Sequence, residues 1–75
     1  MDYNTLSEKL KAGKVVFILD DFEEAAIRLV PVNGKTKAYI KHIGKTEIEI
    51  PQSSKIVFDI VLSGNEITKS VYDRY

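Results

Sequence analysis

Two segments of the sequence contain the core residues of a phosphate-binding loop. Gly-Lys-Thr occurs at residues 34–36 and again at residues 44–46. A phosphate loop also needs a glycine five residues before the Gly-Lys pair, so that backbone N–H groups can surround the phosphates. Those positions hold Leu29 and Tyr39. We therefore interpret both segments as hairpin turns that lead into strands, and we predict no cofactor.

His42 is the only histidine in the chain, and histidine is the residue type that most often acts as a general base near neutral pH. A catalytic dyad or triad could combine His42 with Ser53 or Ser54 as the nucleophile. No nucleophile-elbow motif and no third partner accompany these residues. The pattern favours a histidine at the rim of a sheet, so we predict no catalytic residue and no enzyme activity.

Residues 20–24 form an acidic segment, Asp-Asp-Phe-Glu-Glu. Carboxylate oxygens are ligands for hard divalent ions, but the segment lacks the spaced ligands and the turn glycine of an EF-hand loop. We interpret it as a solvated turn between two strands and predict no metal site. An acidic edge that contacts another protein is the alternative, and it would consist of Asp20, Asp21, Glu23 and Glu24.

The one basic run without an acidic residue spans residues 35–45. Alternation along a strand puts Lys37, Tyr39 and Lys41 on one face, and Arg28 is expected beside Tyr39 on the neighbouring strand. A tyrosine between lysines can stack on a base while the lysines neutralise phosphates. These residues are therefore candidates for binding a partner protein or, as a second hypothesis, a nucleotide or single-stranded nucleic acid.

Charge balance weakens the nucleic-acid hypothesis. The chain has 11 Lys and Arg against 11 Asp and Glu, and so a net charge of zero. Affinity for nucleic acid depends largely on phosphate neutralisation by cationic side chains. Glu47 and Glu49 are also expected on the same sheet face as the lysines, where they would reduce the positive field.

The size and composition of the chain indicate one small domain spanning residues 1–75. There is no cysteine, so disulfides and zinc-thiolate sites cannot support the core. The longest uninterrupted apolar run is Val15 to Leu19, and the first residues carry no basic region. We therefore expect a cytoplasmic protein, in the host cytoplasm if it is phage-encoded, that has no membrane partner.

The elements that would position these residues begin with a short helix. Thr5 and Glu8 have the spacing of a capping box, and Gly13 suits the end of the helix. Residues 15–19 are β-branched, aromatic and aliphatic without polar alternation, which predicts a strand covered on both faces. It is expected to be the core strand.

A hairpin follows, centred on the turn signal Asn33-Gly34. A two-residue loop sets Leu29 opposite Ala38 and Pro31 opposite Thr36. A second loop at residues 43–45 sets Ile40 opposite Ile48 and so keeps the apolar residues of the next strand on the same face. Together these segments predict an antiparallel meander of about four strands with one apolar face.

Residues 53–63 fit two structures. As a helix, the segment has Ser53 as its cap, an apolar stripe and Gly64 at its end, and it would cover the apolar sheet face. As a strand, it shows alternation with many β-branched residues. We favour the helix, which makes the fold α+β, with a short N-terminal helix and one or two C-terminal helices.

The C-terminal residues read as a capped helical turn, with Thr68 as the cap and with Ile67 and Tyr72 in the positions of a hydrophobic staple. This stretch resembles the ending of many small proteins of Gram-positive phages and prophages, although Ser70 stands where those proteins often have Glu. The matching residues are Gly64, Ile67, Thr68, Lys69, Tyr72, Asp73 and Tyr75.

The resemblance implies a phage-type accessory protein, and such proteins commonly act by binding a host component. The leading hypothesis is therefore a non-enzymatic protein that acts by protein–protein contact with a host or phage protein, in host takeover or in inhibition of a host defence system. A minor structural or assembly subunit that forms a homo-oligomer is a further alternative.

Overall fold

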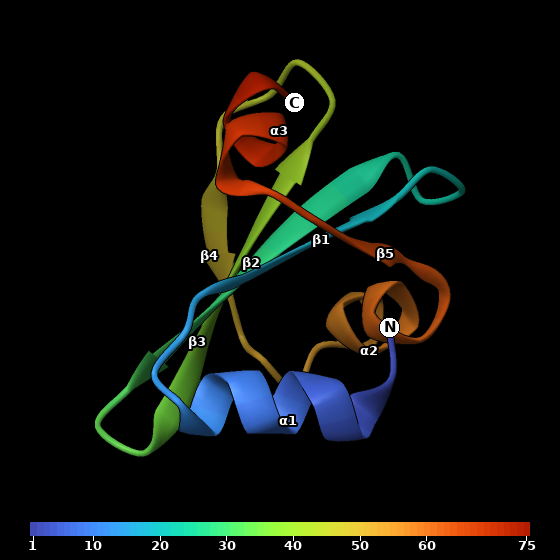
Figure 1. The fold of residues 1–75 in the computed structure, drawn as a ribbon. Helices are drawn as coiled ribbons and strands as arrows, with labels where there is room; N and C mark the ends of the chain where they lie inside the picture. Colours follow the sequence, from blue (N-terminus) through green and yellow to red (C-terminus); the bar gives the residue numbers. More distant parts are fainter.

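The computed structural model describes residues 1–75 as an α+β fold of three helices and five strands (Figure 1). In chain order the elements are α1 (Tyr3–Lys11), β1 (Val16–Asp20), β2 (Ala25–Val32), β3 (Lys35–His42), β4 (Ile48–Ile50), α2 (Lys55–Ser63), β5 (Asn65–Ile67) and α3 (Lys69–Arg74).

All five strands form one antiparallel sheet in the order β4-β3-β2-β1-β5. The predicted register is confirmed, because Leu29 pairs with Ala38, Pro31 with Thr36 and Ile40 with Ile48. The prediction missed β5, a three-residue strand that returns from α2 to pair with β1. The interior position of β1, between β2 and β5, agrees with its uninterrupted apolar sequence.

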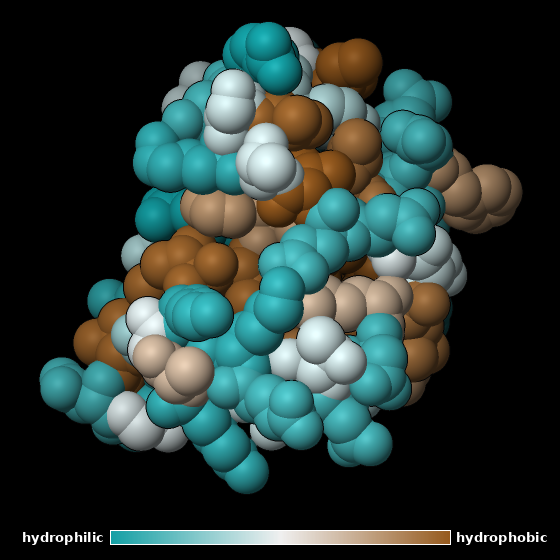
Figure 2. Space-filling view, viewed as in Figure 1, coloured by the Kyte–Doolittle hydropathy of each residue, from teal (hydrophilic) through white to brown (hydrophobic).

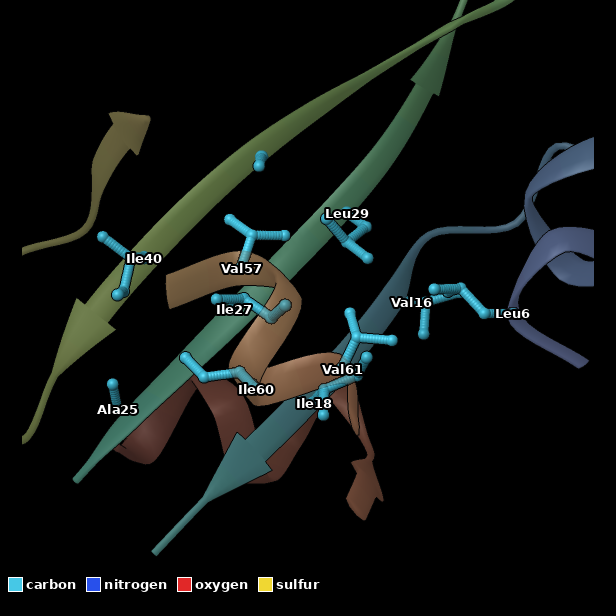
Figure 3. Packing of buried hydrophobic residues seen from close by; sticks show 11 residues of the cluster. Leu6, Val16, Ile18, Ala25, Ile27, Leu29, Ile40, Val57, Ile60 and Val61 are labelled. Carbon is cyan, nitrogen blue, oxygen red and sulfur yellow. The ribbon is translucent and has the colours of Figure 1, made fainter. Parts of the chain in front are cut away.

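The core lies between the sheet and the helices α1 and α2. Figure 3 shows Val57, Ile60 and Val61 of α2 pointing at the strands, among Ile18 and Ile27. Helix α1 contributes Leu6 to the same cluster. The helix interpretation of the segment after Pro51 is therefore confirmed, because its apolar stripe covers the apolar face of the sheet.

The start of α1 differs from the prediction. Asp2 is the N-cap, and its carboxylate accepts a hydrogen bond from the Thr5 N–H at 3.2 Å and another from the Thr5 hydroxyl at 3.0 Å. The capping box between Thr5 and Glu8 was therefore wrong, since Thr5 is already inside the first turn. The C-terminal end agrees with the prediction, because Gly13 has φ +79° and continues the chain out of the helix.

The cap of α2 also differs, since Ser54 rather than Ser53 is the N-cap and makes no side-chain capping bond. Gly64 ends the helix, as predicted, but with an extended backbone of φ −85°. A Cβ at this position would lie 2.6 Å from the carbonyl oxygen of Ile60 and 2.9 Å from that of Leu19. Glycine is required there because two backbone segments approach closely.

The amino terminus lies at the C-terminal end of α2 (Figure 1). The ammonium group of Met1 donates hydrogen bonds to the carbonyl oxygens of Val61 at 2.7 Å and Gly64 at 2.8 Å. A positive charge is favourable at this end of a helix, where carbonyl groups have no partner within the helix. The first residue thus fastens α1 to α2.

Helix α3 packs on the opposite side of the sheet from α1 and α2 (Figure 1). Its N-cap is Thr68, as predicted, and the Thr68 hydroxyl accepts a hydrogen bond from the Val71 N–H at 3.2 Å. Tyr72 is buried, which gives this short helix a fixed position on the sheet. None of the three helices is long and apolar enough to span a membrane.

Candidate functional site

The predicted binding residues lie on the sheet face that carries α3. Arg28 of β2 pairs directly with Tyr39 of β3, and Lys37 and Lys41 lie on the same side of β3 because side chains alternate along a strand. The structure therefore brings these residues onto one face, as the sequence predicted. What each side chain contacts there decides whether it can meet a ligand.

Arg28 is held by contacts within the chain. Its guanidinium donates from Nε to Glu47 Oε1 at 2.9 Å and from Nη2 to Glu47 Oε2 at 2.8 Å. The guanidinium carbon also lies 4.2 Å from the centre of the Tyr39 ring. This forked geometry is the strongest form of an arginine–carboxylate pair, and it occupies one face of the tyrosine ring.

Tyr72 joins this pair from α3. Its hydroxyl donates to Glu47 Oε1 at 2.5 Å, and its ring packs 5.2 Å from the ring of Phe17, centre to centre. Burial raises the pKa of the Tyr72 phenol well above its ordinary value, and the neighbouring Glu47 carboxylate adds to the shift. The arginine holds the pKa of Glu47 below its usual range. Glu47 therefore remains charged at neutral pH and anchors both side chains.

Lys41 caps α3. Its ammonium donates to the carbonyl oxygens of Tyr72 at 2.9 Å and Asp73 at 3.0 Å, and it lies 5.1 Å from the centre of the Tyr72 ring. A cation at the C-terminal end of a helix satisfies carbonyl groups that have no other partner. Lys41 is thus engaged in holding the helix in place.

A cavity of about 590 Å³ lies between these side chains and α3. Its cations each face an acceptor: Arg28 faces Glu47, Lys41 faces helix carbonyls, and Lys69 forms an ion pair with Asp73 at 2.6 Å. A site whose charges are already paired offers little to a phosphate or a carboxylate. Of the predicted binding residues, Lys37 and Tyr39 make no hydrogen bond or ion pair through their side chains. Lys37 is exposed, whereas Tyr39 is half-buried beneath the Arg28 guanidinium.

The predicted acidic edge is the turn between β1 and β2. Asp20 is buried, with 5% of its surface exposed, and its Oδ1 accepts the Phe22 N–H at 2.9 Å. The interpretation of Asp20 as a solvated residue was therefore wrong, because its carboxylate shapes the turn. Asp21 and Glu24 are exposed, Glu23 is half-buried, and the turn thus remains acidic at its surface.

Two helices present a small apolar surface that the sequence analysis did not identify. Tyr3 of α1 is 54% exposed and Phe58 of α2 is 49% exposed, with their ring centres 6.4 Å apart. Leu62 follows Phe58 by one helical turn and is 56% exposed. We call these three residues the helix patch. Figure 2 shows that apolar side chains, in brown, emerge between polar ones on the face that it presents.

Sequence reasoning missed Tyr72 and Glu47 as members of one cluster. Tyr72 was expected to fasten the C-terminus, and Glu47 was expected beside the lysines, but nothing in the sequence connects a residue of the β3–β4 loop with one of the last helix. The cap at Thr68 and the staple positions of Ile67 and Tyr72 were the only signal, because a cap and a staple imply a helix with a buried side chain.

The remaining motifs of the sequence lie in hairpin turns or at the end of a strand. Both Gly-Lys-Thr segments are hairpin turns, as predicted, with φ +78° at Gly34 and φ +70° at Gly44. His42 is exposed at the end of β3, the rim position that was expected. No group of three or more His, Cys, Asp or Glu side chains is placed to hold a metal ion.

Comparisons of the chain with protein-family models, with curated proteins and with solved structures found no match.

Proposed function

We propose that this chain is a non-enzymatic accessory protein of a phage or mobile element that acts by binding a protein, in host takeover or in inhibition of a host defence system. The phage assignment rests on the resemblance of residues 64–75 to the endings of phage proteins. The binding assignment rests on the helix patch, where Tyr3, Phe58 and Leu62 expose apolar surface on adjoining helices.

Exposed apolar side chains that adjoin one another are typical of protein-contact surfaces, whereas single ones are common on any protein. The patch also has the composition of an interface core, since aromatic residues are enriched there and charged ones are depleted. Both helices pack on the core through buried residues, Leu6 in α1 and Val57 in α2, so the backbone that carries the patch is in place before binding. A preformed surface reduces the entropy lost on association.

The alternative of nucleotide or single-stranded nucleic-acid binding has less support. It needs the cations and the aromatic ring of the sheet face to be available to a ligand, but Arg28 is paired with Glu47 and covers one face of Tyr39. Lys41 is engaged with α3. A ligand would have to break these contacts before gaining its own.

The proposal is tested by affinity capture from a Gram-positive host lysate, in which the wild-type chain is compared with a Phe58→Ser, Leu62→Ser variant. The matched control is Ile43→Ser, since Ile43 is as exposed as the patch residues but lies in the β3–β4 turn. We expect a specific partner that is retained by the control and lost by the patch variant. A partner captured equally by all three chains, or by none, would refute the assignment to this surface.

A further inference from the structure

An acidic turn lies at one end of β2, and a groove lined by lysines lies at the other end. The acidic β1–β2 turn, residues 21–24, precedes the strand and projects from the body of the molecule at the right of Figure 1. The β2–β3 hairpin follows the strand and lies beside the end of α1, at the lower left of the same view. Because β2 is eight residues long, no single copy can bring these two ends together.

The hairpin and α1 enclose an open groove of about 620 Å³. Along α1 its wall consists of Tyr3, Leu6 and Leu10, which share one face of the helix. On the other side lie Pro31 and Val32 of β2. The groove thus has apolar side chains on both sides, from α1 and from the end of β2.

The charge at this groove differs from that of the cavity beneath α3. Lys11 and Lys35 lie at its rim, and no Asp or Glu lines it. Neither lysine takes part in any ion pair or side-chain hydrogen bond of the protein, whereas Arg28 and Lys41 are both engaged. The groove therefore combines unpaired positive charge with apolar side chains, which fits an apolar side chain flanked by carboxylates.

The β1–β2 turn presents such a group. Phe22 is 90% exposed, the largest exposure among the large apolar residues of the chain. The hydrogen bond from its N–H to the buried Asp20 carboxylate holds it at the tip, and Glu24 has φ +51°, a conformation that closes a tight turn. In the sequence, Asp21 precedes Phe22, and Glu23 and Glu24 follow it. The turn is thus a preformed apolar anchor with negative charge on both sides.

We propose that the acidic turn of one copy of this chain inserts Phe22 into the groove of a second copy, with its carboxylates facing Lys11 and Lys35 of that copy. The observations favour a second copy as the occupant because the charge and the exposed aromatic ring of the turn complement the lysines and apolar side chains of the groove, and because neither surface is used within one molecule. Such a head-to-tail contact is heterologous, since each copy offers a different surface to each neighbour. Repeated from copy to copy, it generates rings if the rotation between copies closes and open chains if it does not.

The physics of this contact predicts weak association that depends on salt. One aromatic anchor and a few exposed ion pairs form a small interface, of the size found in transient complexes. Exposed ion pairs are screened as ionic strength rises. We expect oligomers that grow with protein concentration and dissociate as sodium chloride is added.

The test combines two variants, each of which keeps only one of the two surfaces of the contact. We call these variants half-competent. Phe22→Ser removes the anchor and leaves the groove intact, whereas Lys11→Glu, Lys35→Glu reverses the groove charge and leaves the turn intact. All three substituted side chains are exposed in the free molecule, and near-native circular dichroism would verify that each variant folds. Lys35→Glu alone serves as a second groove variant that leaves α1 untouched. The matched controls are Ile43→Ser and Lys45→Glu, both in the exposed β3–β4 turn and away from the groove.

Sedimentation velocity measured up to millimolar concentration gives the outcome. We expect the wild type and both controls to associate beyond dimers, and each half-competent variant alone to have its association weakened about tenfold or more. An equal mixture of the two variants should form a one-to-one dimer and stop there, since one intact turn then meets one intact groove. A wild type that stays monomeric, variants that associate as it does, or a mixture without dimers would overturn the proposal.

Tyr3 belongs to both the helix patch and the groove, so the two proposals are tested by substitutions at residues that belong to only one of these surfaces. Loss of the captured partner in the Phe58→Ser, Leu62→Ser variant with unchanged oligomers would support the binding function alone. Loss of oligomers in the Phe22→Ser variant with unchanged partner capture would support the head-to-tail contact alone.

Discussion

Replacing Glu47 with glutamine tests whether the cluster of Arg28, Glu47 and Tyr72 anchors α3 to the sheet. The carboxylate accepts two hydrogen bonds from Arg28 and one from the Tyr72 hydroxyl. Glutamine has nearly the same shape, but its amide group replaces one oxygen with a donor that would face the guanidinium. The variant therefore removes the charge and sets two donors against each other while leaving the packing of α3 unchanged.

The size of the effect follows from how far the pair is exposed to solvent. Hydrogen bonds to charged groups contribute about 1.5–3 kcal/mol each when buried, and exposed ion pairs about 0–1 kcal/mol. The side chains of Arg28 and Glu47 are 30% and 28% exposed, which places the pair between these limits. We expect Glu47→Gln to lower the free energy of unfolding by about 2 kcal/mol. Tyr72→Phe, which removes only the hydroxyl, should cost about 1 kcal/mol.

The assay is urea unfolding followed by circular dichroism at neutral pH and at pH values through the titration of the carboxylate. The pKa of Glu47 lies below its ordinary value of 4.5, chiefly because of the bond to Arg28. Its contribution is therefore present above that ordinary value and is lost as pH falls through the lower folded-state pKa. The difference in unfolding free energy between wild type and Glu47→Gln should shrink as the carboxylate becomes protonated.

The double variant Glu47→Gln, Tyr72→Phe provides a further check. The Tyr72 hydroxyl donates a hydrogen bond to Glu47, so the effects of the two substitutions on stability should not add. A Glu47→Gln protein within about 0.5 kcal/mol of wild type at neutral pH would show that the cluster does not anchor α3. A stability difference of the same size at all pH values would show that charge has no part in it.

Three further predictions concern the ends of the elements, and urea unfolding checks each of them. Gly64→Ala should cost about 2–3 kcal/mol, because the added Cβ meets the carbonyl oxygen of Ile60; a cost near zero would mean that the backbone moves freely there. An N-terminal extension should cost about 1–2 kcal/mol, because it removes the Met1 ammonium from the end of α2, while a C-terminal extension of the same sequence is the control. Truncation before Thr68 should cost about 2 kcal/mol or more, because it removes the buried Tyr72 ring; unchanged stability would contradict the fixed position of α3.

The strands and their register could be predicted because the information is local. Alternation of apolar and polar residues fixes which side chains face the core, and Asn33-Gly34 fixes the turn that aligns β2 with β3. Both residues of that turn have positive φ, as this type of turn requires. The helix cap at Thr68 was equally local, since it depends on a hydroxyl at the right distance from a backbone N–H.

The parts that could not be predicted depend on residues far apart in the sequence. Strand β5 is only three residues long and pairs with β1 from the other end of the chain, so no periodic pattern marks it. Asp2 and Thr5 were both suitable caps by residue type, and the structure uses the earlier one. Propensity alone could not decide between them, since either choice satisfies the first N–H groups of the helix.

The candidate surfaces also combine features that local sequence could predict with features that depend on residues far apart in the chain. The sequence placed Arg28, Tyr39 and Lys41 on one face correctly, but it could not show that Glu47 and α3 engage them. The helix patch arises because Tyr3 of the first helix meets Phe58 of the second. Such contacts depend on how the helices cross the sheet, which follows from tertiary packing rather than from local pattern.

The most direct test of protein binding through the helix patch is photo-cross-linking inside a Gram-positive host. A photoreactive phenylalanine would replace Phe58 in one variant and Ile43, in the β3–β4 turn, in the control. The account predicts a discrete adduct with one host or phage protein from position 58, and no such adduct from position 43. Equal adducts from both positions, or none from position 58, would contradict it.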